Sequence, residues 1–303
     1  MRYFSFLPFC SLFVLISIEI SAQSPVSSFN TKVLSFNVRM SHGNDGINKW
    51  ENRTDLILKT LDEINVDVIG MQEVTSEQFL FFKENLKNYS FYGVGRKDGK
   101  LEDEIMAIFY NNKYELLMDS TIWLSETPAV IGSKSWDAAL YRTVSWLKLK
   151  DKESGIQWMF YNTHFDHRGV QAREESAKVI MKLIADTNHG LPAVLLGDFN
   201  ITKEQKPYEI LTSSWKGCYQ LKDARSITES PHKGGEITAT GFKDNYGKII
   251  DFIFVSDGIK VKSHQYLNVK EGEIFISDHY PVEAELKITN KKIKPNSGGE
   301  SLE

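Results

Sequence analysis

The chain has 303 residues, of which 41% are hydrophobic, so it is long enough to bury a substantial core, and global disorder is excluded. Its formal net charge is −4 at pH 7, which argues against a protein whose main task is to coat long nucleic acid. A nuclease with a local basic groove is not excluded by this charge.

The N-terminal segment has the pattern of an export signal. Arg2 precedes an apolar stretch over residues 4–18, and the small residues Ser21-Ala22 follow it. A basic start, a short apolar stretch and a small-residue exit are typical of a cleaved signal peptide, and the stretch is too short for a membrane span. We therefore expect residues 1–22 to be removed and the protein to be exported to the periplasm or the extracellular space, without stable membrane insertion.

The rest of the chain predicts one domain over residues 23–289, followed by a disordered polar tail at 290–303. Two stretches, 52–65 and 171–187, have the apolar spacing of amphipathic helices. Strands outnumber helices, which indicates an α+β fold with packed sheets covered by helices. Apolar, β-rich runs predict strands at 32–38, 66–72, 105–110, 143–149, 158–165, 192–197, 248–256 and 280–288.

Both predicted helices lead directly into an apolar strand that ends in an acid, Glu73 in one case and Asp198 in the other. This repetition suggests two related halves that each deliver a carboxylate from the end of a strand. In LLGDFN, Asp198 and Asn200 are two residues apart, so on an extended chain they point to the same side. The alternative is an ordinary turn, because Asp and Asn are good turn formers.

Other polar residues follow or interrupt the remaining apolar runs. Each has a structural explanation when taken alone, such as a strand cap or a turn. Asp251 is the exception, because a buried carboxylate costs several kcal/mol unless it is paired, for example with a histidine. The full set of these strand-end residues is Asn37, Glu73, His164, Asp198, Asn200, Asp251, Asp278 and His279.

Six short motifs occur along the chain in the order LSFN, QE, THFDHRG, GDFN, IDFIFVS and SDHYPV. In this order they resemble the endonuclease/exonuclease/phosphatase superfamily, whose fold is that of deoxyribonuclease I. The stretches WLSETP, SWDAALYRT and NTHFDHRG resemble one exported bacterial branch of it. The resemblance implies a four-layer α/β/β/α sandwich with the site at one edge of the two sheets.

The resemblance also implies roles for the strand-end residues. Asn37, Glu73 and Asp278 match positions at or near a metal, and hard oxygen ligands suit Mg²⁺ or Mn²⁺. Asp198 and Asn200 match the residues that orient the attacking water and contact the phosphate.

The histidines match positions around the scissile phosphate. His279 matches either an acid–base group or a phosphate-stabilising cation, and both roles stay open. Asp251 matches its orienting partner, because a carboxylate fixes the tautomer of a histidine and raises its basicity. His164 matches a hydrogen-bond donor to a non-bridging phosphate oxygen.

A second group of residues is expected to contact substrate. Arg142 and Arg168 can clamp a phosphate or a carboxylate, although a surface ion pair explains each equally well. Asp166 and His167 follow His164 closely enough to reach the same substrate. The charged, glycine-flanked segment 93–104, which includes Arg96, Asp98 and Glu104, is expected to be a solvated loop, and the alternative is a loop that reads substrate.

These residues predict an exported Mg²⁺- or Mn²⁺-dependent phosphoesterase acting on a phosphodiester or a phosphomonoester. The alternative is a secreted nuclease that scavenges nucleic acid or nucleotides without sugar specificity. A non-catalytic binding protein on the same fold is disfavoured because the catalytic set is complete. A glycosidase that uses Glu73 and Asp198 would leave His279 and Asn200 without a role.

Overall fold

The computed structural model describes residues 1, 3, 27–214, 220–244 and 246–290. Apart from Met1 and Tyr3, the expected signal peptide lies outside these residues, and so does the expected tail apart from Asn290. Within the described part of the chain, no helix combines the length and apolar character needed to cross a bilayer.

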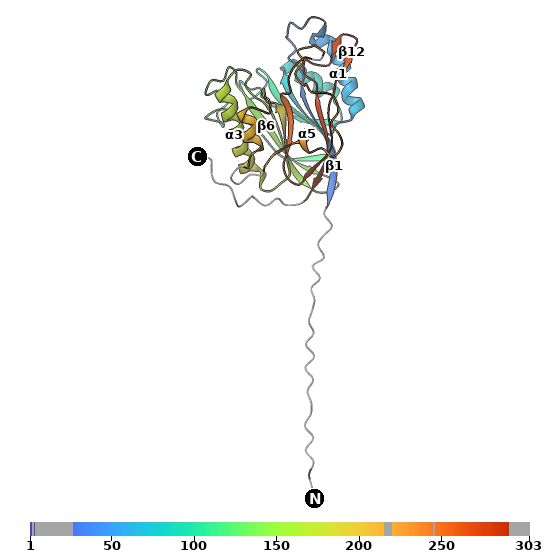
Figure 1. The fold of residues 1–303 in the computed structure, drawn as a ribbon, viewed down its shortest axis with the longest axis vertical. Coiled ribbons are helices and arrows are strands. Elements are labelled where there is room, and N and C mark those ends of the chain that lie inside the picture. Colours follow the sequence, from blue (N-terminus) through green and yellow to red (C-terminus); the bar gives the residue numbers. More distant parts are fainter. Residues whose placement is uncertain (2, 4–26, 215–219, 245, 291–303) are drawn as a thin grey trace.

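Two six-stranded sheets form the centre of the molecule (Figure 1). The first sheet has the order β11 (Ile259–Tyr266), β14 (Val282–Thr289), β1 (Ser28–Asn37), β2 (Val68–Val74), β4 (Ile105–Asn111) and β3 (Tyr89–Tyr92). The second has the order β5 (Tyr114–Trp123), β6 (Thr143–Asp151), β7 (Gln157–His164), β8 (Ala193–Asp198), β10 (Asp251–Val255) and β9 (Lys222–Asp223). A small ribbon joins β12 (Lys270–Glu271) and β13 (Ile274–Phe275).

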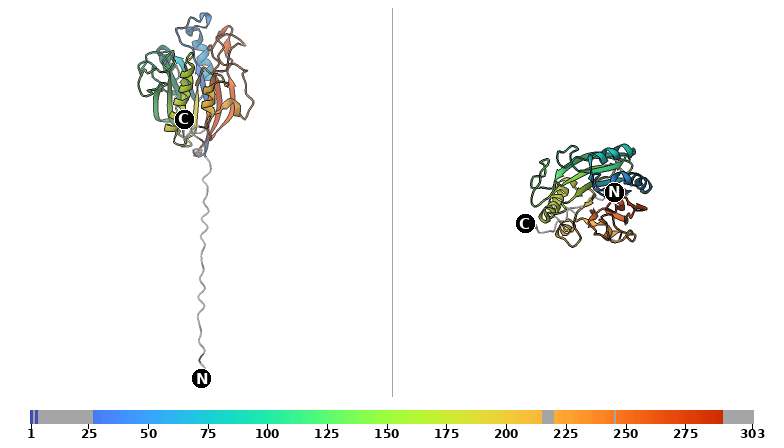
Figure 2. Two further views of the ribbon diagram at one scale, coloured as in Figure 1. Left: turned by 60° about the vertical axis from the view of Figure 1, so that its left-hand side comes forward. Right: turned by 90° about the horizontal axis from the view of Figure 1, so that it is seen from above.

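Helices cover both outer faces of the paired sheets (Figures 1 and 2). Against the first sheet lie α1 (Trp50–Ile64) and α2 (Ser76–Asn85), and their apolar residues share a core with β1, β2 and β4. Against the second lie α3 (Val170–Asn188) and α4 (Lys206–Thr212), which share a core with β7, β8 and β10. A third core fills the space between the sheets. The predicted four-layer α/β/β/α sandwich is therefore confirmed. The short helices are η1 (Gly46–Asn48) and α5 (Ala224–Ile227).

Each sheet contains one parallel strand pair, and these pairs position the polar residues. β1 runs parallel to β2 with α1 between them in sequence, and β7 runs parallel to β8 with α3 between them. The carboxyl ends of parallel strands meet at one edge of a sheet, where open α/β folds place their ligands. In these registers Asn37 pairs with Gln72, and His164 pairs with Asp198. The repetition seen in the sequence is thus a pair of strand–helix–strand units.

Several elements differ from the sequence-based expectation. The strand predicted at 248–256 shortens to β10, because Lys248 and Ile250 bond to the loop residue Thr238 instead of a strand. β3, β5 and β11 were not predicted, since they lie at or near sheet edges and carry mixed polar and apolar residues. Helix α2 was also missed, although its Thr75 side chain and Gln78 form a capping box that the sequence displays.

A buried amide ties the two sheets together. Asn162 on β7 is fully buried, and its Nδ2 donates to the carbonyls of Met71 and Ala107, each at 2.9 Å, in the opposite sheet. Its Oδ1 accepts a hydrogen bond from Gln72 at 2.7 Å. All three contacts cross the interface between the sheets, so Asn162 fixes how one sheet sits on the other.

Replacing Asn162 by alanine is expected to lower the free energy of unfolding by about 3 kcal/mol, because three buried hydrogen bonds between the sheets are lost, although Gln72 keeps other partners. Urea unfolding followed by circular dichroism measures this change. The matched control is Asn85→Ala at an exposed helix end, where a change within about 0.5 kcal/mol is expected. A loss below about 1 kcal/mol in Asn162→Ala would show that water replaces the amide.

Candidate active site

Two acids and a histidine meet where β8 ends and β10 begins. His279 Nδ1 lies 2.9 Å from Asp251 Oδ2, and its Nε2 lies 3.9 Å from Asp198 Oδ2. All three residues are buried, and Asp251 faces Asp198 across the strand pair. The predicted pairing of Asp251 with a histidine is therefore present.

The charges of this group shift its pKa values. Burial alone would lower the pKa of His279, but the charge of Asp251 and its hydrogen bond raise that pKa well above the usual 6.5. His279 is therefore an imidazolium at neutral pH. Burial, reinforced by the negative charge of Asp251, raises the pKa of Asp198 to about 7. The acid thus titrates where a general base is most effective.

An amide and a second carboxylate complete the other side of the site. Asn37 Nδ2 donates to Glu73 Oε1 at 3.1 Å and to Asp198 Oδ2 at 3.0 Å, so it holds one acid from each sheet. Glu73 lies where the β2–β4 pairing is irregular, and its φ is +58°. An irregular register re-aims a side chain, and a positive φ in a non-glycine residue marks local strain that occurs often at functional sites.

Arg39 lies between the acids. Its guanidinium is 4.0 Å from Glu73 Oε2, 3.7 Å from Asp278 Oδ2 and 3.0 Å from Asp45 Oδ1. The hydrogen bond to Asp45 raises the pKa of Arg39 despite partial burial. Burial also raises the pKa of Asp278, which means that its ionised form needs a nearby cation.

Asn200 and His164 form a third part of the site. Asn200 Nδ2 donates to His164 Nε2 and to the carbonyl of Phe165, both at 3.1 Å. Burial, together with the charges of Arg142 and Arg96, lowers the pKa of His164 well below 6.5, so the ring is neutral. Both N–H groups of the amide are occupied, and Asn200 therefore positions His164.

Asp198 and Asn200 converge, but not because the chain is extended as their spacing suggested. Strand β8 ends at Asp198, and Asn200 has φ +50°. The backbone N–H of Asn200 donates to Asp198 Oδ1 at 2.9 Å, which is an Asx-type turn. Both side chains approach His164, since Asp198 Oδ2 lies 3.4 Å from its Nε2. The turn and the site are thus the same structure.

The residues present fit a hard divalent cation. Oxygen atoms of Glu73 and Asp198 and a ring nitrogen of His164 lie within 4.8 Å of one another. Of these three only Glu73 was predicted as a ligand, and the two other predicted ligands, Asn37 and Asp278, lie outside this group. Asn37 Oδ1 already accepts from the N–H of Arg39 at 3.0 Å and keeps one lone pair, and Asp278 reaches the cluster through Arg39. An acidic, oxygen-rich site in which an arginine already neutralises two acids is chemically suited to Mg²⁺ or Mn²⁺.

Behind His164 lies a buried group of charges that corrects one expectation. Segment 93–104 was expected to be solvated, but Arg96 and Glu104 are only 4% and 5% exposed and form an ion pair at 2.8 Å. Arg142 is 4.0 Å from Glu104, and its Nε and Nη1 have no hydrogen-bond partner. Arg142 Nε also lies 3.8 Å from Asp166 Oδ2, so the guanidinium is held between two carboxylates, and its positive charge acts on His164 from behind.

The segment after His164 divides into two roles. Asp166, expected to contact substrate, is 1% exposed, and its carboxylate accepts the N–H groups of Leu140, Arg168 and Gly169. Burial opposes ionisation, but these bonds hold the pKa of Asp166 at about 2. Asp166 therefore orders the loop. His167 and Arg168 are exposed beside it, and His167 Nδ1 lies 3.4 Å from Arg142 Nη2.

The sequence reasoning missed Arg39, and it did not predict that Arg96 and Glu104 are buried as an ion pair. Arg39 stands two residues after Asn37, so the same spacing argument that selected Asn200 would have selected it. Nothing in segment 93–104 distinguishes its buried charges from its exposed ones, because burial there depends on contacts with distant residues.

Sequence comparison adds to this geometry. A sequence model of the Endonuclease/Exonuclease/phosphatase family matches residues 34–279, which include every strand-end residue described above. The chain belongs to this family. Members of the endonuclease/exonuclease/phosphatase family are hydrolases that act on phosphate esters with a divalent metal.

Two solved structures are similar over almost their full length. One is an endonuclease/exonuclease/phosphatase from Bacteroides vulgatus, with a TM-score of 0.80 and 36% identity, covering 86% of this chain and 99% of that one. Another is a mannosyl-6-phosphatase from Bacteroides thetaiotaomicron, with a TM-score of 0.78 and 34% identity, covering 84% and 99%. Human nocturnin is 26% identical over 212 residues, which are 64% of this chain but only 46% of nocturnin.

Proposed function

We propose that this protein is a divalent-metal-dependent phosphatase that hydrolyses a phosphorylated sugar. The observation that carries the hydrolytic part is the chain of contacts from Asp251 through His279 and Asp198 to Asn37 and Glu73, which joins both sheets. The likeness to a mannosyl-6-phosphatase at 34% identity supports the sugar phosphate as the substrate.

In this proposal Glu73, Asp278 and Asn37 hold Mg²⁺ or Mn²⁺ at the point that Arg39 now neutralises. When bound, the cation would neutralise charge on the phosphate and on the leaving oxygen. While its oxygen faces the cation, the Nδ2 of Asn37 keeps Glu73 and Asp198 at their present separation.

Asp198 acts as the base. It accepts a proton from the attacking water while the new bond to phosphorus forms and the bond to the sugar oxygen breaks, and the released sugar oxygen takes up a proton from bulk water. Attacking and leaving oxygens lie roughly in line in phosphoryl transfer. Because His279 Nε2 is only 3.9 Å from Asp198, it lies on the attack side. Its positive charge therefore stabilises the phosphate oxygens rather than protonating the leaving group.

The remaining residues hold the phosphate. In this proposal His164 contacts a non-bridging oxygen, for which its N–H must stand on Nε2 in place of the hydrogen bond from Asn200. The guanidinium of Arg142 is buried against Asp166 and Glu104, so it adds positive charge from behind His164 rather than a direct contact. Arg168 and His167 are exposed at the rim, where they can contact the sugar. The N-terminal pattern supports export of the chain that begins at Gln23.

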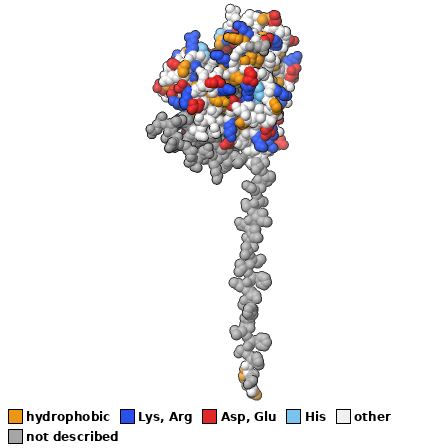
Figure 3. Space-filling view, in the orientation of Figure 1, with side chains coloured by type: hydrophobic (Ala, Val, Ile, Leu, Met, Phe, Trp, Pro, Cys, Tyr) orange, Lys and Arg blue, Asp and Glu red, His pale blue; other side chains and the backbone are white. Residues whose placement is uncertain are grey.

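A nuclease is the second candidate, since the chain matches nocturnin and a probable RNA exonuclease of yeast at 26% identity. Non-specific nucleic-acid binding relies on a basic groove with stacking aromatics. On the face shown in Figure 3, basic and acidic side chains are interspersed, and no continuous basic stripe crosses it. This face therefore offers no basic groove of the kind that a non-specific nuclease uses.

The test is release of product from a panel of substrates. The chain from Gln23 would be assayed with Mg²⁺ or Mn²⁺ on sugar phosphates, nucleotides, single- and double-stranded DNA and RNA, inositol phosphates and phospholipids. His279→Ala is the inactive control. Hydrolysis of sugar phosphates alone supports the proposal, whereas cleavage of nucleic acid by the wild type but not by the variant would favour the nuclease.

Chelation gives an independent prediction. EDTA is expected to lower turnover by about 10³-fold or more, because the charge on the phosphate then has no divalent counter-ion. Added Mg²⁺ or Mn²⁺ should restore it, while the thermal midpoint shows that the fold persists. Activity that survives complete chelation would remove the metal from the mechanism.

A further inference from the structure

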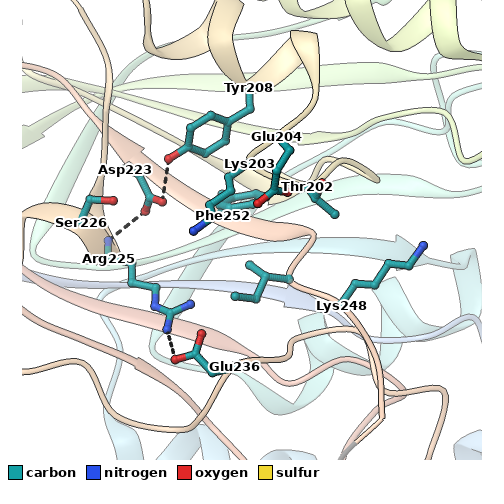
Figure 4. A pocket seen from close by; sticks show the side chains of 11 residues that line it. Thr202, Lys203, Glu204, Tyr208, Asp223, Arg225, Ser226, Glu236, Lys248 and Phe252 are labelled. Atoms are coloured by element: carbon teal, nitrogen blue, oxygen red, sulfur yellow. Dashed lines mark hydrogen bonds and ion pairs between the residues drawn. The ribbon is translucent and has the colours of Figure 1, made fainter.

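A cavity of about 430 Å³ lies at the flank of the second sheet, outside the cluster of catalytic residues. We refer to it as the flank pocket (Figure 4). Its wall includes Lys203, Tyr208, Asp223, Arg225, Glu236 and Phe252, which come from the loop after β8, from α4, β9, α5 and β10, and from the loop before β10. Its volume is in the range of small-molecule sites.

The flank pocket begins close to the catalytic residues. Thr202 in its wall is two residues after Asn200, and Ile249 is two residues before Asp251. Two peptide units span at most about 7 Å between Cα atoms. A substrate whose phosphate lies beside Asn200 can therefore extend into the pocket if a second unit is joined to the phosphorylated one.

The charges of the pocket balance. Its acids are Glu204, Asp223 and Glu236, and its bases are Lys203, Arg225 and Lys248, so the formal sum is zero. The acids are engaged in part: Asp223 accepts from the Tyr208 hydroxyl at 3.0 Å and from the N–H of Arg225 at 2.9 Å.

Glu236 pairs with Arg225 at 2.5 Å. Among the described residues, neither Lys203 nor Lys248 forms an ion pair. Figure 4 shows the ammonium of Lys203 pointing into the space near Phe252, whereas Lys248 points outward at the opposite rim. Because the formal charges of the wall sum to zero, the pocket has no excess positive charge that would select a second anion. It offers both hydrogen-bond donors and acceptors.

The apolar part of the wall is aromatic. The rings of Tyr208 and Phe252 pack edge to face with centroids 5.5 Å apart, and Ile249 extends the apolar surface. Ser226 and Thr202 add hydroxyl groups. The wall therefore combines an aromatic surface with balanced charges and hydroxyl groups. A complementary ligand has C–H faces and a rim of hydroxyl groups, as a neutral sugar does.

We propose that the flank pocket binds a neutral sugar unit joined to the phosphorylated sugar, so that the preferred substrate is a phosphorylated oligosaccharide. This inference rests on the proposed phosphatase function. It predicts that the enzyme distinguishes a phosphorylated disaccharide from a free sugar phosphate through binding.

The first experiment compares mannose 6-phosphate with a mannobiose that carries one 6-phosphate. Ser226→Trp fills the pocket from an exposed position, and Lys203→Ala removes its free ammonium; Ser230→Trp and Lys182→Ala are the matched surface controls. For the disaccharide, Ser226→Trp should raise KM at least about 10-fold and Lys203→Ala about 3-fold, with kcat retained. Values for mannose 6-phosphate should stay within about two-fold. Equal changes for both substrates, or none, would overturn the proposal.

The second experiment needs no turnover and so separates the pocket from the proposed function. Unphosphorylated mannobiose is titrated into the wild type and into Ser226→Trp by calorimetry, with thermal midpoints as the folding control. Binding that Ser226→Trp abolishes supports the proposal even if no phosphoester is hydrolysed. Absence of binding, binding that the variant leaves unchanged, or binding of inorganic phosphate that the variant abolishes would each overturn it.

Discussion

Replacement of Asp198 by asparagine is expected to lower kcat by about 10³-fold or more, because the base that accepts the proton of the attacking water is lost. The substitution is nearly isosteric, and its amide oxygen can keep the contact with the N–H of Asn200. Its NH₂ group then faces Asn37 Nδ2, so the hydrogen bond that Asn37 donates to Asp198 is lost. KM should change little, since Asp198 acts on water rather than on the sugar. Steady-state kinetics with the metal bound measure both values.

The matched control is Asp151→Asn. Asp151 is also a buried acid at a strand end. It lies at the end of β6 that is far from the catalytic residues, and it accepts a hydrogen bond from Ser154 in a turn. Its replacement should leave kcat unchanged even if stability falls. An Asp198→Asn variant that keeps more than about a tenth of wild-type turnover would show that another group accepts the proton.

Replacement of Asp251 by asparagine is expected to lower kcat by about 10²-fold or more and to move the alkaline limb of the pH–rate profile to lower pH. In the wild type the charge of Asp251 raises the pKa of His279. The imidazolium is therefore present below that raised pKa, and activity is lost as the pH rises through it. Without the charge of Asp251 the pKa falls, and activity is lost at a lower pH.

The pH–rate profile separates this role from a purely structural one. A variant that is folded and slow but has an unchanged alkaline limb would show that His279 does not act as a cation. A variant that no longer folds would show that the buried acid supports the fold through its hydrogen bond to His279. The Asp151→Asn control should keep the wild-type profile.

The sequence predicted the layers of the fold and the strand-end polar residues because both depend on local patterns. Alternating apolar runs and amphipathic spacing define strands and helices wherever burial follows the chain. The edges were harder to predict. β5 pairs with only one strand and has mixed side chains, and α2 is marked by its cap more than by its apolar face.

Among the polar residues of the site, the sequence also placed some correctly and misjudged others. Asp198, Asn200, His279 and Asp251 converge as expected, since each lies beside a strand that must end at the same edge. Asp166 looked equally polar in sequence, yet its carboxylate is consumed by three backbone N–H groups of its own loop. The backbone conformation of the loop decides whether such a carboxylate faces the substrate or the backbone N–H groups.

The sequence alone therefore determined the family motifs, the two strand–helix–strand units and the acids at their ends, because residue identity and period are properties of the chain. Only the tertiary structure decided which charges are buried: Arg39 between Glu73 and Asp278, and Arg96 against Glu104. It also decided that the wall of the flank pocket comes from segments as far apart in sequence as Thr202 and Phe252. Burial and electrostatic coupling depend on which residues are neighbours in space. The packing of the two sheets against each other determines those neighbours, and a local sequence pattern does not contain this information.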